Sequence, residues 1–122
     1  KVSNGTLMSF SFKTKALEVI TPENLELGKT NCARELAYVD HADWLLIGHN
    51  VQRGEKKTGK TLTRVYDCST NKYFLLDAGP VPDGYGAGWM YDAKRKLTYS
   101  FTTGGEAWAI RIEPKTAQRI EE

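Results

Sequence analysis

Apolar and polar residues alternate along much of this chain, and short polar turns interrupt the alternation. The segment 7–12 alternates in this way, and the segment 106–112 places Trp108, Ile110 and Ile112 on one face of an extended chain. A period of two residues is typical of β-strands whose two faces differ. Turn signals recur at 21–24, 67–71, 79–84 and 113–116. Many short strands separated by turns predict an all-β sandwich, barrel or propeller.

An internal repeat narrows this choice. The strand-turn-strand segment that contains Asp40 and Leu45 matches the segment that contains Asp92 and Leu97, at a shift of 52 residues. The segment 31–49 also has a loose apolar stripe that would suit a helix. The repeat and the β-rich residues that follow Asp43 favour strands instead.

A second type of hairpin alternates with the first. The segments 65–72 and 111–118 share an acidic residue and a threonine, and 12–20 is a weaker copy. Two hairpins then form a four-stranded unit of about 50 residues, which is the size of a propeller blade. The predicted fold is therefore all-β, with about two and a half four-stranded antiparallel blades of a β-propeller in an incomplete ring. The predicted units are a half blade at about 5–21, a blade at about 33–77 and a blade at about 86–121.

Three segments resemble elements of the Kelch repeat. Tyr66–Tyr73 has the Tyr-Asp pair, a polar turn and an aromatic residue, and Gly86–Asp92 is similar to the strand that opens a blade. Phe101–Trp108 contains a Gly-Gly pair that the earlier copy lacks. Arg119 stands where the preceding copy has an aromatic residue. The chain thus resembles a Kelch-type or related quinoprotein-like propeller over about 90 residues.

The resemblance implies a binding scaffold whose ligands sit on loops between and within blades. The expected loops are 22–34, 49–60, 78–88 and 102–106. The candidate ligand-binding residues on this face are Arg53, Lys56, Lys60, Asp83 and Tyr85. Glycines on both sides of Tyr85 would let its ring stand exposed, where aromatic residues suit sugar or protein contacts.

Propellers need about four to eight blades to close, so further blades are expected as partners. They could come from the same protein, from identical copies or from a second chain. The chain begins with Lys1 rather than Met, which suggests a processed product or part of a larger protein. A net charge of +2 gives no reason to expect a nucleic-acid partner, and no apolar run is long enough for a membrane span.

Few motifs point to catalysis, and no cofactor or metal is predicted. The segment 54–61 fits the P-loop pattern, but the β-rich residues after it contradict the helix that a P-loop requires. His41 and His49 show no metal-ligand spacing, and His41 is expected to be solvated in a turn. Cys32 and Cys68 could form a disulfide or remain free thiols.

The function that these features favour is a non-catalytic propeller segment that binds a protein or glycan and assembles with further blades. The alternative is part of a propeller enzyme, of the oxidase or quinoprotein kind, whose catalytic residues lie elsewhere. A third hypothesis is a nucleotide-binding domain that uses the loop from Gly54 to Thr61.

Overall fold

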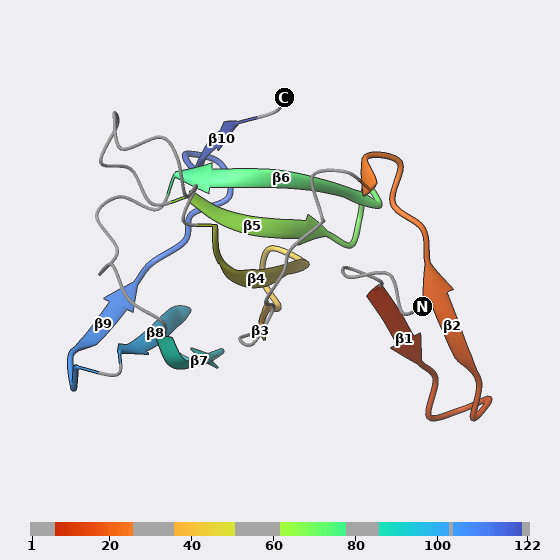
Figure 1. The fold of residues 1–122 in the computed structure, drawn as a ribbon, viewed down its shortest axis with the longest axis horizontal. Helices are drawn as coiled ribbons and strands as arrows, with labels where there is room; N and C mark the ends of the chain where they lie inside the picture. Colours follow the sequence, from red (N-terminus) through yellow and green to blue (C-terminus); the bar gives the residue numbers. More distant parts are fainter. Residues whose placement is uncertain (1–6, 26–35, 51–61, 78–85, 103, 121–122) are drawn as a thin grey trace.

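The computed structural model describes residues 7–25, 36–50, 62–77, 86–102 and 104–120. This part of the chain is all-β, as the alternation predicts, and forms ten strands in three antiparallel sheets (Figure 1). The strands are β1 (Leu7–Phe10), β2 (Leu17–Ile20), β3 (Leu36–Val39), β4 (Trp44–Asn50), β5 (Leu62–Asp67), β6 (Lys72–Asp77), β7 (Gly86–Asp92), β8 (Leu97–Thr102), β9 (Ala107–Ile110) and β10 (Gln118–Ile120). The helix considered for 31–49 is wrong, because β3 and β4 occupy most of that segment.

The strands pair mainly with their neighbours in sequence. β1 and β2 form the N-terminal hairpin, and β7, β8 and β9 form the C-terminal sheet. The central sheet has the order β10-β6-β5-β4-β3. The sequence placed a fourth strand at the end of the last blade, beside β9. The structure instead pairs this strand, β10, with β6, so the C-terminal sheet has three strands and the central sheet has five.

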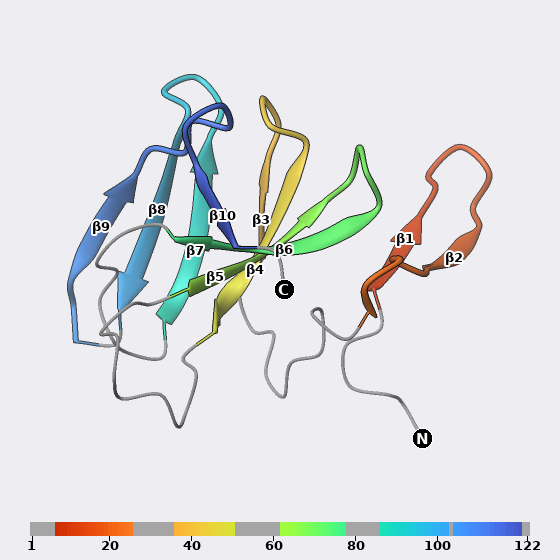
Figure 2. The ribbon, with the colours of Figure 1, turned by 90° about the horizontal axis from the view of Figure 1, so that it is seen from above.

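Four hairpins turn through the same type of four-residue loop. The last residue of each loop has a left-handed backbone, and these residues are Lys15, Asp43, Asn71 and Lys96, with φ between 54° and 58°. They recur at intervals of 28, 28 and 25 residues. Figure 2 shows the four tips on one side of the molecule. The repeat seen in the sequence is therefore a repeat of hairpin geometry.

This geometry corrects the register of the repeat by one residue. Asp40 is the first loop residue after β3, whereas Asp92 is still the last residue of β7 and pairs with Leu97. The loops superpose at a shift of 53 residues, which makes Tyr38 and Tyr91 equivalent. Loop length fixes the register of a hairpin, and the matching Asp side chains do not.

Most of the central sheet is buried on both faces. Its first face packs against residues of the C-terminal sheet, including Trp89, Tyr91 and Ile110. Its second face packs against Leu7 and Ile20 of the N-terminal hairpin. The residues that form the first face are Ala37, Val39, Trp44, Leu46, Val65, Phe74 and Leu76, and those of the second face are Ile47, Tyr66 and Tyr73. Strands buried on both faces read as nearly continuous apolar runs, as β6 does.

The outer edge of β6 is covered along its length. The side-chain amide of Asn24 donates to the carbonyl of Tyr73 at 2.6 Å and accepts from the Tyr73 amide at 2.7 Å, so it replaces a neighbouring strand. Lys72 forms an ion pair with Glu23 at 2.9 Å beside it. β10 covers the other half of the edge. Covering an edge in this way prevents a further strand from pairing there.

Arg119 of β10 contacts three residues of the central sheet. Its guanidinium carbon lies 4.9 Å from the ring centre of Trp44 and 4.7 Å from that of Phe74. Its Nη1 also lies 3.8 Å from Oδ2 of Asp67. Burial opposes ionisation of Asp67, but hydrogen bonds from Ser69 and Thr70 outweigh it and hold the pKa of this carboxyl below its usual value. The cation thus meets two aromatic faces and a carboxylate.

The left-handed loop position predicts a stabilising substitution. We expect Lys96→Gly to raise the free energy of unfolding by about 0.5–1 kcal/mol. Glycine adopts a left-handed backbone without the steric cost that a lysine side chain adds. This gain should exceed the stability lost because glycine gives the unfolded chain more conformational entropy. Urea denaturation measures the change. The control is Lys94→Gly in the same loop, where the backbone is not left-handed and glycine should lower stability. Equal losses in both variants would contradict the loop geometry.

Candidate functional site

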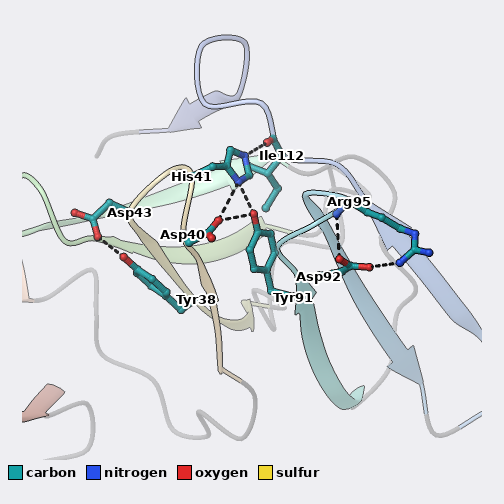
Figure 3. A network of polar contacts seen from close by, with 8 residues as sticks. All are labelled: Tyr38, Asp40, His41, Asp43, Tyr91, Asp92, Arg95 and Ile112. Atoms are coloured by element: carbon teal, nitrogen blue, oxygen red, sulfur yellow. Dashed lines mark hydrogen bonds and ion pairs between the residues drawn. The ribbon is translucent and has the colours of Figure 1, made fainter. Parts of the chain in front are cut away.

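A polar junction joins the tip of the β3–β4 hairpin to the C-terminal sheet and to the connection between β9 and β10 (Figure 3). Nδ1 of His41 lies 2.6 Å from the Tyr91 hydroxyl, and Nε2 lies 3.0 Å from the carbonyl oxygen of Ile112. The same hydroxyl of Tyr91 donates to Oδ1 of Asp40 at 2.8 Å. The rings of His41 and Tyr91 also stack, with centres 5.9 Å apart. We call these four residues the tip junction.

The local turn places His41 for these contacts. Backbone hydrogen bonds from Ala42 to Val39 and from Asp43 to Asp40 close the tight turn and direct His41 toward β7. The turn was predicted, but the solvation of His41 was not correct, because its side chain is only 16% exposed. Its partners lie 50 and 71 residues away in sequence. No local pattern could have revealed them.

The tip junction does not resemble an acid–base site. Burial, together with the hydrogen bond to Asp40, raises the pKa of Tyr91 to about 12, so its hydroxyl stays protonated near neutral pH and is a poor general acid. Both ring nitrogens of His41 already face protein atoms. Within the described residues, no group of three or more His, Cys, Asp or Glu side chains could hold a metal ion. The arrangement is suited to joining two sheets.

The predicted ligand-binding residues fall outside the described part of the chain. These residues are Arg53, Lys56, Lys60, Asp83 and Tyr85. The strand ends that lead toward them are described, and the pairings Asn50–Leu62 and Leu62–Asp77 bring three ends of the central sheet together. These ends lie opposite the hairpin tips in Figure 2. The strand ends that lead toward the predicted ligand loops therefore share one side of the central sheet, while the binding role of the residues themselves remains a prediction.

The P-loop hypothesis conflicts with the strand that follows the motif. Residues 54–61 lie outside the described residues, but β5 begins at Leu62 and pairs antiparallel with both β4 and β6. A P-loop places its phosphate at the start of a helix that follows a strand. A central antiparallel strand at this position provides no such helix.

Other candidates from the sequence have structural or exposed positions. Cys68 is an exposed free thiol in the β5–β6 turn, and Cys32 lies outside the described residues. Trp44 and Trp89 pack between sheets, whereas Trp108 is 39% exposed.

One hollow of about 420 Å³ lies where the chain crosses from the C-terminal sheet to the central sheet. The lining includes the charged residues Asp77, Arg111 and Glu113. Arg111 and Glu113 are exposed. Catalytic groups usually need a desolvated cleft that shifts their pKa values. The hollow forms where the chain crosses between the two sheets, and its lining residues do not indicate a catalytic site.

Comparisons with known proteins do not identify the chain. No protein-family model, no curated protein and no solved structure matches it. Among the residues that the structure describes, no helix is long and apolar enough to cross a membrane. The surfaces and contacts of the chain itself are thus the basis for inferring its function.

Because of the tip junction, we expect loss of the hydroxyl to reduce stability more at Tyr91 than at Tyr38, which occupies the equivalent position in its own hairpin. Tyr91→Phe should lower the free energy of unfolding by about 1–3 kcal/mol, because it leaves groups of His41 and Asp40 without their partner. Tyr38→Phe is the matched control. The Tyr38 hydroxyl donates to Asp43 within its own hairpin at 2.7 Å, and Tyr38 is half exposed, so the loss of stability should be much smaller than for Tyr91→Phe. Thermal or urea unfolding measures both, and equal effects would contradict a joining role.

Proposed function

We propose that this chain is a non-catalytic β-scaffold segment of the propeller type, which assembles with further blades and presents loops to a protein or glycan ligand. The observation that carries the proposal is that both end sheets have apolar outer faces that nothing in the described chain covers. Large exposed apolar faces on a protein mark interaction surfaces.

The outer face of the N-terminal hairpin is the first of these surfaces. The pairings of β1 with β2 put Met8 opposite Val19 and Phe10 opposite Leu17, all on the face that points away from the central sheet. Val19 is 62% exposed, and Phe12 beyond them is 81% exposed. Phe10 and Phe12 pack edge to face with ring centres 5.3 Å apart. We call this surface the N-terminal outer face.

The outer face of the C-terminal sheet is the second. Met90, Tyr99 and Ala109 lie side by side across its three strands, and Phe101 pairs with Ala107 on the same face. Met90 is 54% exposed. The opposite face of this sheet carries the residues that pack on the central sheet. The sheet thus has one covered and one uncovered apolar face.

The central sheet shows a third uncovered area next to the N-terminal hairpin. Leu36 and Tyr38 share its second face with Leu45 and Ile47, because these residues are paired between β3 and β4. The hairpin covers Ile47 but leaves Leu36 and Tyr38 about half exposed. This area adjoins a hairpin with two strands where a blade has four. Two further strands in that position would extend a contact that the chain already makes.

In the proposed assembly, each sheet packs one of its faces against a face of the next sheet. Within the chain, the central sheet already uses each of its faces for such a contact. A sheet that packs on either outer face would repeat this arrangement. The tight tips would then line one side of the assembly, and the strand ends that lead to the predicted ligand loops would line the other.

The proposal predicts measurable association or apolar dye binding. The wild-type chain should sediment above the mass of a single chain, or should bind the dye bis-ANS as a single chain, because its outer faces are apolar. Leu17→Ser combined with Val19→Ser should weaken whichever signal is seen. Analytical ultracentrifugation and dye fluorescence measure the two signals.

Glu18→Ser provides the matched control in the same strand. Glu18 lies on the opposite face of β2 and pairs with Ser9, so its replacement should leave the association and the dye signal unchanged. A monodisperse single chain without dye binding would overturn the proposal. An equal effect of the control would also overturn it.

A further inference from the structure

We propose that the tip junction takes up one proton when it closes, so that the contact between the β3–β4 hairpin and the C-terminal sheet weakens as the pH rises. This inference goes beyond the proposed scaffold function and does not depend on it. It rests on the count of hydrogen atoms in the contacts of His41, Tyr91 and Asp40.

Three short contacts in the tip junction need three hydrogen atoms. The carbonyl of Ile112 can only accept, so Nε2 of His41 must carry a hydrogen for the 3.0 Å contact. An ionised Asp40 can only accept as well, so the Tyr91 hydroxyl uses its one hydrogen in the 2.8 Å contact. The 2.6 Å contact between Tyr91 and Nδ1 of His41 then needs a hydrogen on Nδ1.

A neutral imidazole cannot meet this requirement, because it carries hydrogen on only one of its nitrogens. With a neutral His41 and an ionised Asp40, two lone pairs would face each other at one of the short contacts. One additional proton completes all three hydrogen bonds, whether it resides on His41 or on Asp40. The high pKa of Tyr91, which burial and Asp40 raise to about 12, keeps its hydroxyl protonated.

The other charged groups around the junction do not change this count. Asp43 accepts from the Tyr38 hydroxyl, and Asp92 is paired with Arg95 at 2.8 Å, as Figure 3 shows. The hydrogen bonds and charge of Arg95 hold the pKa of Asp92 below its usual value, so it titrates below the pH range considered below. Glu113, which follows Ile112, is exposed.

The sign of the effect follows from linkage. In an unfolded chain, an imidazole loses its proton near pH 6.5, whereas the closed junction retains one. The folded state then binds more protons than the unfolded state above that pH, so stability decreases as pH rises. One proton changes the unfolding equilibrium constant by at most about tenfold per pH unit. Below pH 6 the contribution is fully present, because both states are protonated.

The variant Asp40→Asn distinguishes a junction that requires an additional proton from one that only contributes packing and hydrogen bonds. An asparagine amide can donate to the Tyr91 oxygen, which frees the hydroxyl to donate to a neutral His41. The three hydrogen bonds then form without the additional proton. Asp40 is exposed (55% at its side chain), so the substitution should not prevent folding.

The experiment compares unfolding equilibrium constants by urea denaturation from about pH 5.5 to 8, in a His49→Gln background that removes the other histidine. We expect the constant of the reference chain to rise with pH by several-fold over this range. We expect the constant of Asp40→Asn to change less than twofold, so that this variant is the more stable one at pH 8. Parallel pH profiles for the two chains, or a flat profile for the reference chain, would overturn the proposal.

Nitrogen NMR of the His41 ring gives a second readout that does not depend on unfolding. In the reference chain, both ring nitrogens should carry hydrogen at pH 6.5, or the Asp40 carboxyl should carry the proton. In Asp40→Asn, only Nε2 should carry hydrogen at pH 7.5. A neutral His41 beside an ionised Asp40 at pH 6.5 would overturn the proposal.

Discussion

The burial of both faces of the central sheet is the constraint on which the rest of the structure depends. A single sheet cannot cover itself, so the side chains on its two faces require a layer on each side. Trp44 and Phe74 meet edge to face at 4.9 Å on the first face, and Tyr66 and Tyr73 lie 5.3 Å apart on the second. The C-terminal sheet and the N-terminal hairpin supply the two layers. Their own outer faces then remain apolar, and no described residue covers them.

Contacts between the layers are of two kinds. Apolar side chains provide most of the buried area, and polar groups fix how the elements meet. Asn24 replaces a strand at the edge of β6, Arg119 holds β10 across two rings, and the tip junction ties β7 to the β3–β4 turn. Such polar contacts stabilise one relative arrangement because hydrogen bonds and cation–π contacts require specific distances and directions. The hairpin tips are consequently fixed more specifically than apolar packing alone would require.

Local sequence predicted the hairpins but not their distant partners. Alternation and turn residues gave the strands, because side-chain period and loop chemistry are local properties. The place of β10 could not be predicted, since a three-residue strand has little pattern and the contact of Arg119 with Trp44 joins residues that are distant in sequence. The burial of His41 escaped prediction for the same reason. The matching residues Tyr38 and Tyr91 carry the observed register of the repeat, which differs by one position from the register that the matching Asp residues suggest.

The most direct test of the account is whether both layers pack on the central sheet in solution. Methyl NOE spectra should show contacts from Ile20 to the rings of Tyr66 or Tyr73, and from Ile110 to residues of the other face such as Val39 or Phe74. The account predicts both sets of contacts in one folded species. Absence of either set, in a chain whose central strands are protected from hydrogen exchange, would contradict the layered arrangement.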